Sequence, residues 1–530
     1  MTIIIVMNNK TLHLIPLPAH IERLPGVFRL TSQALIDSDE LSLHAANYLQ
    51  STILAECKMA FTLQNESKVG TFHLRVIPST AAKESYTLTI HPDRVEITSP
   101  DPTGVFYAVQ TLLQIIFQHC DRNELPCLHI DDTPRFRWRA MMLDEARHFQ
   151  GMQEVKRILD VMARFKMNVF HWHLTDDQGW RIEINQYPRL VNIGSKRPGT
   201  SYSHKPQPHN HIPHSGFYTQ SEIREIVQYA AERQITIVPE IEFPGHTTAA
   251  LAAYPENSCT GGLFDVATHW GIFPELYCPS KESTFSFFQN VLSEILTLFP
   301  GEYVHIGGDE APMKRWKKCP DCLKKSSALG IDIRDLRTWF TNRLINFLRT
   351  HQKRAIGWSE VLRPGLERDM ILQHWLPQKN KGIKALQEGR SMIISPYLDV
   401  YLDHSYDLIS LRHLYLFNPV YKNVDPTIAQ TILGMEAPLW SEYIWDPRRL
   451  DYQLFPRLLA CAEVGWSLAD RKDYADFESR VKGMLRWFDM RQIGYAPPSE
   501  WDSPSWKRLA AFFKIRQPKT RIPTGNLPLP

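Results

Sequence analysis

The chain has 530 residues, of which 43% are hydrophobic and 22% are charged, and its formal net charge is +3. This composition is ordinary for a soluble globular protein, and the length suits two or three domains. The sequence has no basic run that would indicate nucleic-acid binding, and its longest uncharged apolar run, Val105–Gln118, is too short to cross a bilayer. We therefore expect neither a nucleic-acid partner nor a membrane partner, while the oligomeric state stays open.

The N-terminus carries no basic region, and its apolar run over residues 2–7 is too short for a signal peptide. The expected location is therefore cytoplasmic. Eight cysteines in a chain of this length do not form a disulfide scaffold.

The first 130 residues mix short strands with a helix and predict a small α+β domain. Residues 86–90 and 94–97 alternate in polarity around a Pro-Asp turn, which is typical of a β-hairpin. A helix is expected to begin near Asp101, with apolar residues spaced along one face. Pro126 and the cluster Asp131–Pro134 are taken as the end of this domain.

From residue 131 to about 470, candidate strands alternate with amphipathic helices, such as the one over Gln153–Phe165. The candidate strands are Trp138–Leu143, Asn168–Leu174, Thr236–Ile241, Tyr303–Ile306, Arg354–Trp358, Met370–Gln373, Ser391–Ser395 and Thr431–Glu436. Eight such repeats predict a (β/α)8 TIM barrel, whose active site lies where the strands end. Residues 194–216 are expected to form a long loop, and residues 471–530 a helical extension with a loose Pro-rich end.

The stretch Val304–Glu310 carries the strongest chemical signal. A short β-branched run ends in Gly307-Gly308, and two adjacent carboxylates, Asp309 and Glu310, follow at once. Aromatic residues recur near other candidate strand ends: Trp172, Trp358, Trp375, Tyr401 and Trp440. Carboxylates framed by aromatic rings are typical of glycosidic bond cleavage, in which a carboxyl protonates the leaving oxygen and a ring stacks on the sugar.

Taken strand end by strand end, the sequence resembles the family 20 glycoside hydrolases, the β-N-acetylhexosaminidases, over about residues 80–470. The matching segments are 139–149, 168–180, 239–246, 305–310, 357–358, 374–375, 401–403 and 434–442, in that order. In this family the 2-acetamido group of the substrate acts as the nucleophile and forms an oxazolinium-type intermediate. The resemblance implies that Glu310 is the general acid and base and that Asp309 orients the acetamido group and balances its charge.

The same resemblance implies a set of residues around the two carboxylates. Tyr401 would bind the acetamido oxygen, and Trp358, Trp375 and Trp440 would wall the acetamido methyl and the ring. The hydroxyls remote from the scissile bond would be held by Arg139, Asp403 and Glu442, and Asp176, His246, His173 and Glu242 would lie behind the acid. Many family members have Asp where Glu242 stands, so its role is less firmly implied.

Four other patterns suggest different chemistry. His171 and His173 share one face of a strand and are compatible with two metal ligands. The long loop holds four histidines scattered among prolines, an arrangement typical of solvated side chains: His204, His209, His211 and His214. Cys319-Pro-Asp-Cys322 is a lone C-x-x-C, which is a weak signal for zinc or redox chemistry, and Cys259 and Cys278 bracket a loop as a disulfide would. The metal-free family pattern makes us expect no metal and no cofactor.

The predicted activity is release of terminal non-reducing β-linked GlcNAc from an oligosaccharide or glycoconjugate, with GalNAc preference left open. The alternatives are a disaccharide-releasing or endo-acting relative, a non-catalytic sugar-binding barrel, and a metallohydrolase that uses His171 and His173.

Overall fold

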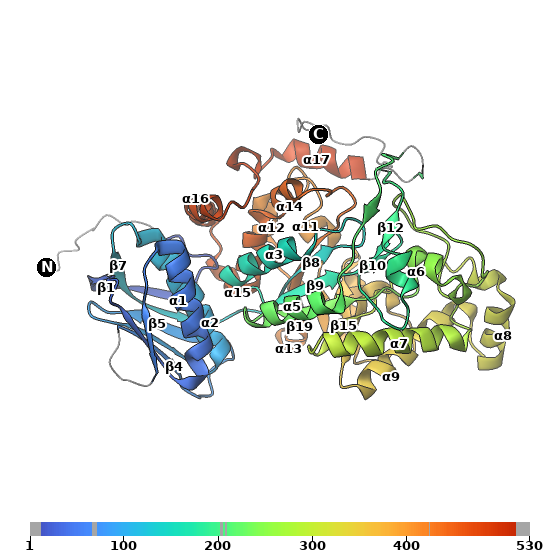
Figure 1. The fold of residues 1–530 in the computed structure, drawn as a ribbon, viewed down its shortest axis with the longest axis horizontal. Helices are drawn as coiled ribbons and strands as arrows, with labels where there is room; N and C mark the ends of the chain where they lie inside the picture. The colour runs from blue at the N-terminus through green and yellow to red at the C-terminus, as the bar shows by residue number, and fades with distance from the viewer. Residues whose placement is uncertain (1–11, 66–70, 202–204, 207–208, 423, 516–530) are drawn as a thin grey trace. The chain divides into compact units, whose positions relative to one another are not determined.

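The computed structural model describes residues 12–65, 71–201, 205–206, 209–422 and 424–515 (Figure 1). The predicted Pro-rich tail, His204 and the apolar N-terminal run lie outside these residues. The chain divides into two compact units. The first comprises residues 1–139, 161–167 and 458–498, and the second comprises residues 140–160, 168–457 and 499–530.

The first unit holds a seven-stranded sheet in the order β1-β7-β5-β6-β4-β2-β3. Its strands are β1 (His20–Arg29), β2 (Leu35–Ser38), β3 (Thr62–Asn65), β4 (Phe72–Val76), β5 (Tyr86–Ile90), β6 (Val95–Ser99) and β7 (Glu124–Asp132). Two helices, α1 (Leu43–Cys57) and α2 (Pro102–His119), contact each other and cover the sheet (Figure 1). The Asp101 side chain caps α2 by accepting the Gly104 N–H at 3.0 Å, and Pro102 occupies the first turn.

The second unit is built on a closed barrel of eight parallel strands in the order β14-β15-β16-β17-β18-β19-β8-β9. The strands are β8 (Trp138–Asp144), β9 (Val169–His173), β14 (Thr236–Glu240), β15 (Tyr303–His305), β16 (Arg354–Trp358), β17 (Ile371–His374), β18 (Met392–Ile394) and β19 (Ile432–Leu439). The predicted (β/α)8 barrel and the small domain before it are confirmed, because all eight predicted strands occur within two or three residues of their expected ends.

The described residues also form α-helices and two short hairpins. The longer helices are α3 (Met152–Arg164), α5 (Gln220–Ala231), α7 (Glu282–Leu298), α8 (Pro320–Leu329), α9 (Leu336–Thr350), α10 (Lys379–Gln387), α14 (Pro447–Leu454), α15 (Arg457–Trp466), α16 (Tyr474–Met490) and α17 (Ser505–Ile515). The shorter ones are α4 (Arg189–Asn192), α6 (Thr248–Ala253), α11 (Tyr397–Val400), α12 (Leu411–Leu416) and α13 (Pro426–Ala429). The hairpins pair β10 (Thr175–Asp176) with β11 (Gly179–Trp180), and β12 (Lys196–Arg197) with β13 (His214–Ser215). None of the helices in the described part of the chain is long and apolar enough to cross a membrane.

Two sequence expectations need adjustment. Pro126 does not mark the end of the first domain, because it lies inside β7, opposite Val27 at the point where the pairing of β1 with β7 shifts register. A proline lacks the N–H that a regular ladder needs, and a bulge tolerates it. Helix α16, expected in a C-terminal extension, belongs to the first compact unit.

The register of the barrel strands brings several polar strand ends to the same height. Glu240, the last residue of β14, pairs with His173 at the end of β9 and with His305 at the end of β15. Asp144 at the end of β8 pairs in turn with His173. Four polar side chains therefore end neighbouring strands at one height, at the barrel end where active sites of this fold form.

Candidate active site

The loop after β15 carries Asp309 and Glu310 in a constrained backbone. Gly307 and Gly308 have φ values of 61° and 106°, and a Cβ on Gly307 would lie 1.8 Å from the Glu242 carboxylate. Both glycines are therefore required by conformation and by space. Glu310 itself has a φ of 40°, a left-handed conformation that is unfavourable for a residue with a side chain. Backbone strain of this kind concentrates at functional sites.

The two carboxylates differ in exposure. The Glu310 side chain is 33% exposed, whereas the Asp309 side chain is only 11% exposed. Glu310 can therefore meet a substrate oxygen and water, while Asp309 lies deeper. Burial raises the pKa of Asp309 to about 7, with His246 opposing this shift and the neighbouring Glu310 adding to it.

His246 links the carboxylates to a second pair of acids. Its Nε2 lies 3.6 Å from Glu310 Oε2 and 3.8 Å from Asp309 Oδ2, which are charge contacts longer than hydrogen bonds. Its Nδ1 lies 3.2 Å from both Asp176 Oδ1 and Asp177 Oδ2. Although burial opposes the charge, the Asp176 carboxylate raises the pKa of His246 well above its usual value. A protonated imidazole therefore faces both acids of the loop.

Behind His246, a buried network continues through Asp176 to the barrel interior. Asp176 Oδ2 accepts from His173 Nε2 at 3.0 Å, and His173 Nδ1 donates to Glu240. Glu240 also accepts the Trp358 indole N–H at 2.8 Å and lies 2.7 Å from His305 Nδ1. The predicted residues Asp176, His173, His246 and Trp358 are thus brought together, and Glu240 is the group that joins them.

An aromatic wall adjoins this network, since Trp358 contacts Glu240 and Trp440 contacts His173. Trp358 and Trp440 have ring centroids 5.8 Å apart, and Tyr401 lies 6.3 Å from Trp440. Burial raises the pKa of the Tyr401 phenol well above its usual value, so the hydroxyl stays protonated and can donate. Trp375, which follows β17, contacts Tyr397 at 6.0 Å, and Tyr397 contacts Tyr401. Four aromatic residues predicted to surround the sugar therefore form one connected group.

The structure does not place Arg139 at the site. Its guanidinium donates to the carbonyls of Lys166 and Phe136 at 2.8 and 2.7 Å, lies 2.9 Å from Glu84, and is fully buried. Arg139 is the second residue of β8, at the end of the strand opposite the site, and so it supports the fold.

Arg147, which follows β8, occupies the position that the sequence analysis gave to Arg139. Its Nη2 lies 2.7 Å from Asp176 Oδ2 and its Nη1 lies 3.3 Å from Asp144 Oδ2. Its guanidinium lies 4.9 Å from the centre of the Trp440 ring. The position of Arg147 in the sequence could have indicated it, because active-site residues of a barrel follow the ends of its strands. Arg147 follows the end of β8, whereas Arg139 lies near its start.

Two further carboxylates complete the group around Arg147. Burial raises the pKa of Glu442 to about 7, while the Arg147 charge opposes this and Asp403 adds to it. The charges of Arg147 and Asp403 therefore both act on Glu442. Charged groups of this kind suit the hydroxyl groups of a sugar.

Glu242 lies directly behind the catalytic loop, against Gly307. Neither of its carboxylate oxygens has a hydrogen-bond partner within the described residues. Burial, followed by the neighbouring Asp309, raises its pKa well above the usual value. Burial and the nearby Asp309 thus both disfavour a negative charge on Glu242.

The paired histidines of β9 are engaged by carboxylates. His171 Nδ1 lies 2.6 Å from Glu436 Oε1, and both ring nitrogens of His173 contact acids. Although burial opposes it, Glu436 and Glu240 raise the pKa of His171 to about 9. These histidines thus act as hydrogen-bonding partners of carboxylates, and the ligand atoms of His171, Glu240 and His305 lie within 4.8 Å of one another.

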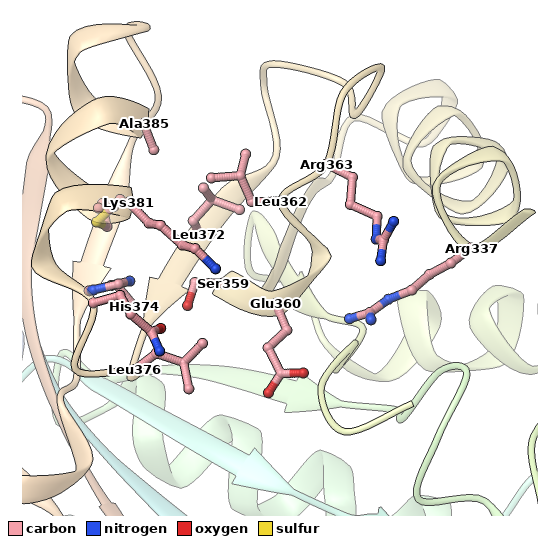
Figure 2. Close-up of a pocket in the computed structure, with 13 residues that line it drawn as sticks. Arg337, Ser359, Glu360, Leu362, Arg363, Leu372, His374, Leu376, Lys381 and Ala385 are labelled. Carbon is pink, nitrogen blue, oxygen red and sulfur yellow. The ribbon is translucent and has the colours of Figure 1, made fainter. Parts of the chain in front are cut away.

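A cavity of about 300 Å³ lies beside the catalytic loop, with Glu360, Arg337 and Lys381 among its lining residues (Figure 2). Glu360 Oε2 accepts the Glu310 backbone N–H at 3.1 Å, and so it helps to hold the strained residue. A second hollow of about 840 Å³ is lined in part by Trp375, Tyr397 and Asp399.

Comparisons with known proteins now bear on this geometry. Residues 136–469 match the catalytic domain of glycosyl hydrolase family 20, and residues 11–133 match domain 2 of that family. The chain belongs to glycosyl hydrolase family 20, the β-hexosaminidases. The resemblance inferred from the strand-end motifs is therefore confirmed.

Several relatives illustrate the family. A β-hexosaminidase of Porphyromonas gingivalis is 37% identical over 92% of this chain, which spans 65% of that relative's length. A β-hexosaminidase of Vibrio furnissii is 34% identical over 86% of the chain and 77% of the relative. The structure of an exo β-N-acetylglucosaminidase from Vibrio harveyi in complex with N-acetylglucosamine matches with a TM-score of 0.83 and 32% identity. That match covers 92% of this chain and 78% of the V. harveyi chain.

The raised pKa of Asp309 predicts a stability effect with a defined sign. Between the ordinary aspartate pKa of 3.8 and about 7, the unfolded chain releases a proton that the folded chain retains, so the wild type loses stability as pH rises. Asp309→Asn removes this loss. We expect the melting temperature of Asp309→Asn, relative to wild type, to be higher at about pH 8 than at about pH 5.

Asp332→Asn is the control, because hydrogen bonds from Arg334 lower the pKa of Asp332 to about 2, so its titration falls below this window. Its melting-temperature difference from wild type should be the same at both pH values. If the difference in melting temperature between Asp309→Asn and wild type does not depend on pH, Asp309 does not have a pKa raised by burial.

Proposed function

We propose that this chain is an exo-acting, retaining β-N-acetylhexosaminidase that releases terminal β-linked GlcNAc by substrate-assisted catalysis. The observation that carries the proposal is the pair Asp309 and Glu310 on one strained loop, unequally exposed and both within 3.8 Å of His246. The N-acetylglucosamine complex of the V. harveyi relative supports the sugar class.

The unequal exposure supports a division of labour. Glu310, on the solvent side, donates a proton to the glycosidic oxygen and later takes one from water. Asp309, on the buried side, accepts the acetamido N–H of the substrate and offsets the positive charge that develops as its oxygen attacks C1. A buried carboxylate suits this task, because the attraction between opposite charges is stronger in a low-dielectric site than in water.

The surroundings fit a single pyranose ring. Trp358, Trp440 and Tyr401 form the wall on which the acetamido group and the ring face would rest, with Trp375 beside them. Arg147, Asp403 and Glu442 offer charged partners for hydroxyls distant from the scissile bond. Arg147 thus takes the role that the sequence analysis gave to Arg139.

A terminal sugar held by charged partners favours exo action, because chain extension beyond that sugar would have to displace them. The disaccharide-releasing or endo-acting alternative requires an open passage past Arg147 and Glu442. Both modes share the chemistry at Asp309 and Glu310.

The division of labour predicts two different responses to the leaving group. Glu310→Gln cannot donate a proton, so its rate should depend steeply on the pKa of the departing phenol. Asp309→Asn loses assistance to ring closure instead, and its rate should fall by a similar factor for good and poor leaving groups. The measurement is kcat/KM for a series of aryl β-GlcNAc substrates with graded phenol pKa, on wild type and both variants.

Azide provides the matched test of the second step. A small anion can replace the missing base, so added azide should rescue Glu310→Ala more than Asp309→Ala. Equal leaving-group slopes together with equal azide responses would contradict the separate roles.

The corrected arginine assignment makes a separate prediction. Arg147→Lys loses the planar fork that spans Asp144 and Asp176, and KM for aryl β-GlcNAc should rise about ten- to a hundredfold, as expected for a lost charged hydrogen bond. Arg139→Lys is the control, because that residue contacts only fold-supporting groups. It should lower the melting temperature and leave KM unchanged. The reverse pattern of KM effects would restore Arg139 to the site.

A further inference from the structure

Four cysteines outside the hydrogen-bond network of Asp309 and Glu310 converge on one point. The sulfur atoms of Cys259, Cys278, Cys319 and Cys322 all lie within 4.8 Å of one another. Cys322 Sγ lies 3.8 Å from Cys259 Sγ and 3.6 Å from Cys278 Sγ. Half of the cysteines of the chain are thus gathered in one cluster.

Local structure explains how distant residues meet. Ser258 and Tyr277 form an antiparallel bridge, which brings the adjoining Cys259 and Cys278 side by side in the segment after β14. Cys319 is the N-cap of α8, with Pro320 in the first turn, so Cys322 lies one turn further along the same helix. The C-x-x-C pair thus approaches the other two sulfurs from the N-terminus of a helix, where the helix dipole favours thiolates.

The cluster is enclosed. Cys278, Cys319 and Cys322 are buried, and they form a small core with Leu276, Trp316 and Leu336. Cys259 is half-buried at its edge. The Trp316 indole N–H donates to the Tyr277 carbonyl at 2.9 Å, which binds the two cysteine-bearing segments together. The four sulfurs therefore lie in a water-poor, ordered pocket.

The distances distinguish a metal site from disulfides. A disulfide requires sulfurs about 2.05 Å apart. Four thiolates bound tetrahedrally to zinc at about 2.3 Å lie about 3.8 Å from one another. The measured separations of 3.6 and 3.8 Å match the tetrahedral edge. We propose that Cys259, Cys278, Cys319 and Cys322 bind one structural Zn²⁺ ion.

The charges of nearby side chains are consistent with a zinc ion bound by four thiolates. Zinc with four thiolates carries a net charge of −2, and Lys317, Lys318 and Lys324 lie within two residues of Cys319 or Cys322 in the sequence. A site with four cysteine ligands has no open position, so the ion holds structure and takes no part in the chemistry. This replaces the expectation that the chain contains no metal.

The four cysteines lie next to the loop that carries Asp309 and Glu310. The zinc site fastens the segment after β14 to the segment after β15, and Ala311 and Met313 pack against the same small core. Ala311 directly follows Glu310. The zinc site would therefore support the strained loop from its C-terminal side, without contacting substrate.

The decisive experiment measures metal in the full-length protein. Wild type dialysed against a weak chelator should retain about one zinc ion per chain by inductively coupled plasma mass spectrometry. Cys322→Ser should lose it. Cys120→Ser is the control, since Cys120 lies outside the cluster and half-buried in the first unit, and it should keep the wild-type zinc content.

Two measurements on wild type keep the test valid if Cys322→Ser does not fold. All eight cysteines should react as thiols after denaturation with a strong chelator and without reductant. Protein produced with cobalt should show the thiolate-to-metal charge-transfer and strong visible bands of a tetrahedral sulfur site. Zinc-free wild type with only four reactive thiols would overturn the proposal in favour of two disulfides, and so would zinc retained by Cys322→Ser.

Discussion

The site depends on a buried carboxylate, Glu240, that ends the barrel strand β14 and is shared by imidazoles of its neighbours. His171 and His173 come from β9 and His305 from β15, and the Trp358 indole N–H from β16 completes the group. A buried charge is costly unless it is paired and hydrogen-bonded. Although burial opposes it, these histidines hold the pKa of Glu240 well below its usual value, so the negative charge persists inside the barrel.

This pairing orients everything nearer to the substrate. With one nitrogen held by Glu240, His173 must offer the other to Asp176, and Asp176 in turn faces His246 and Arg147. His246 then stands between Asp176 and the two acids of the loop. One buried anion thereby fixes a chain of alternating charges that reaches Glu310. The same register also positions Trp358 at the base of the aromatic wall.

The loop stores strain that this network can support. Glu310 and His246, which face each other at 3.6 Å, both have positive φ values, 40° and 52°. Glu242 is buried without a hydrogen-bond partner among the described residues, and the pKa of Asp309 is raised by burial. Each feature lowers stability locally, and together they place a proton donor and a buried anion side by side. Such a trade of stability for function is expected at active sites.

Much of this arrangement was accessible from the sequence. Period, length and β-branched content predicted all eight barrel strands, and strand-end position singled out Asp309, Glu310 and the aromatic residues. The motif assigned the sugar-binding role to Arg139, the second residue of β8, whereas Arg147 follows the end of that strand, and only the fold shows which end each residue occupies. Glu240, His305 and Glu436 were overlooked because their importance lies in the pairing between strands, which a single sequence does not display. The cysteine cluster was missed for a similar reason: Cys259 and Cys278 join the C-x-x-C pair only through the fold.

The central claim is that the sugar's own acetamido group attacks C1, with Asp309 behind it. The most direct measurement compares an aryl β-GlcNAc with its mono-, di- and trifluoroacetamido analogues and with the matching aryl β-glucoside. We expect kcat/KM to fall steeply with each added fluorine, because the acetamido oxygen becomes a weaker nucleophile. The glucoside should be slower than the GlcNAc substrate by at least about three orders of magnitude, since it has no internal nucleophile. Similar rates across the fluorinated series and on the glucoside would contradict the account and require a nucleophile supplied by the enzyme.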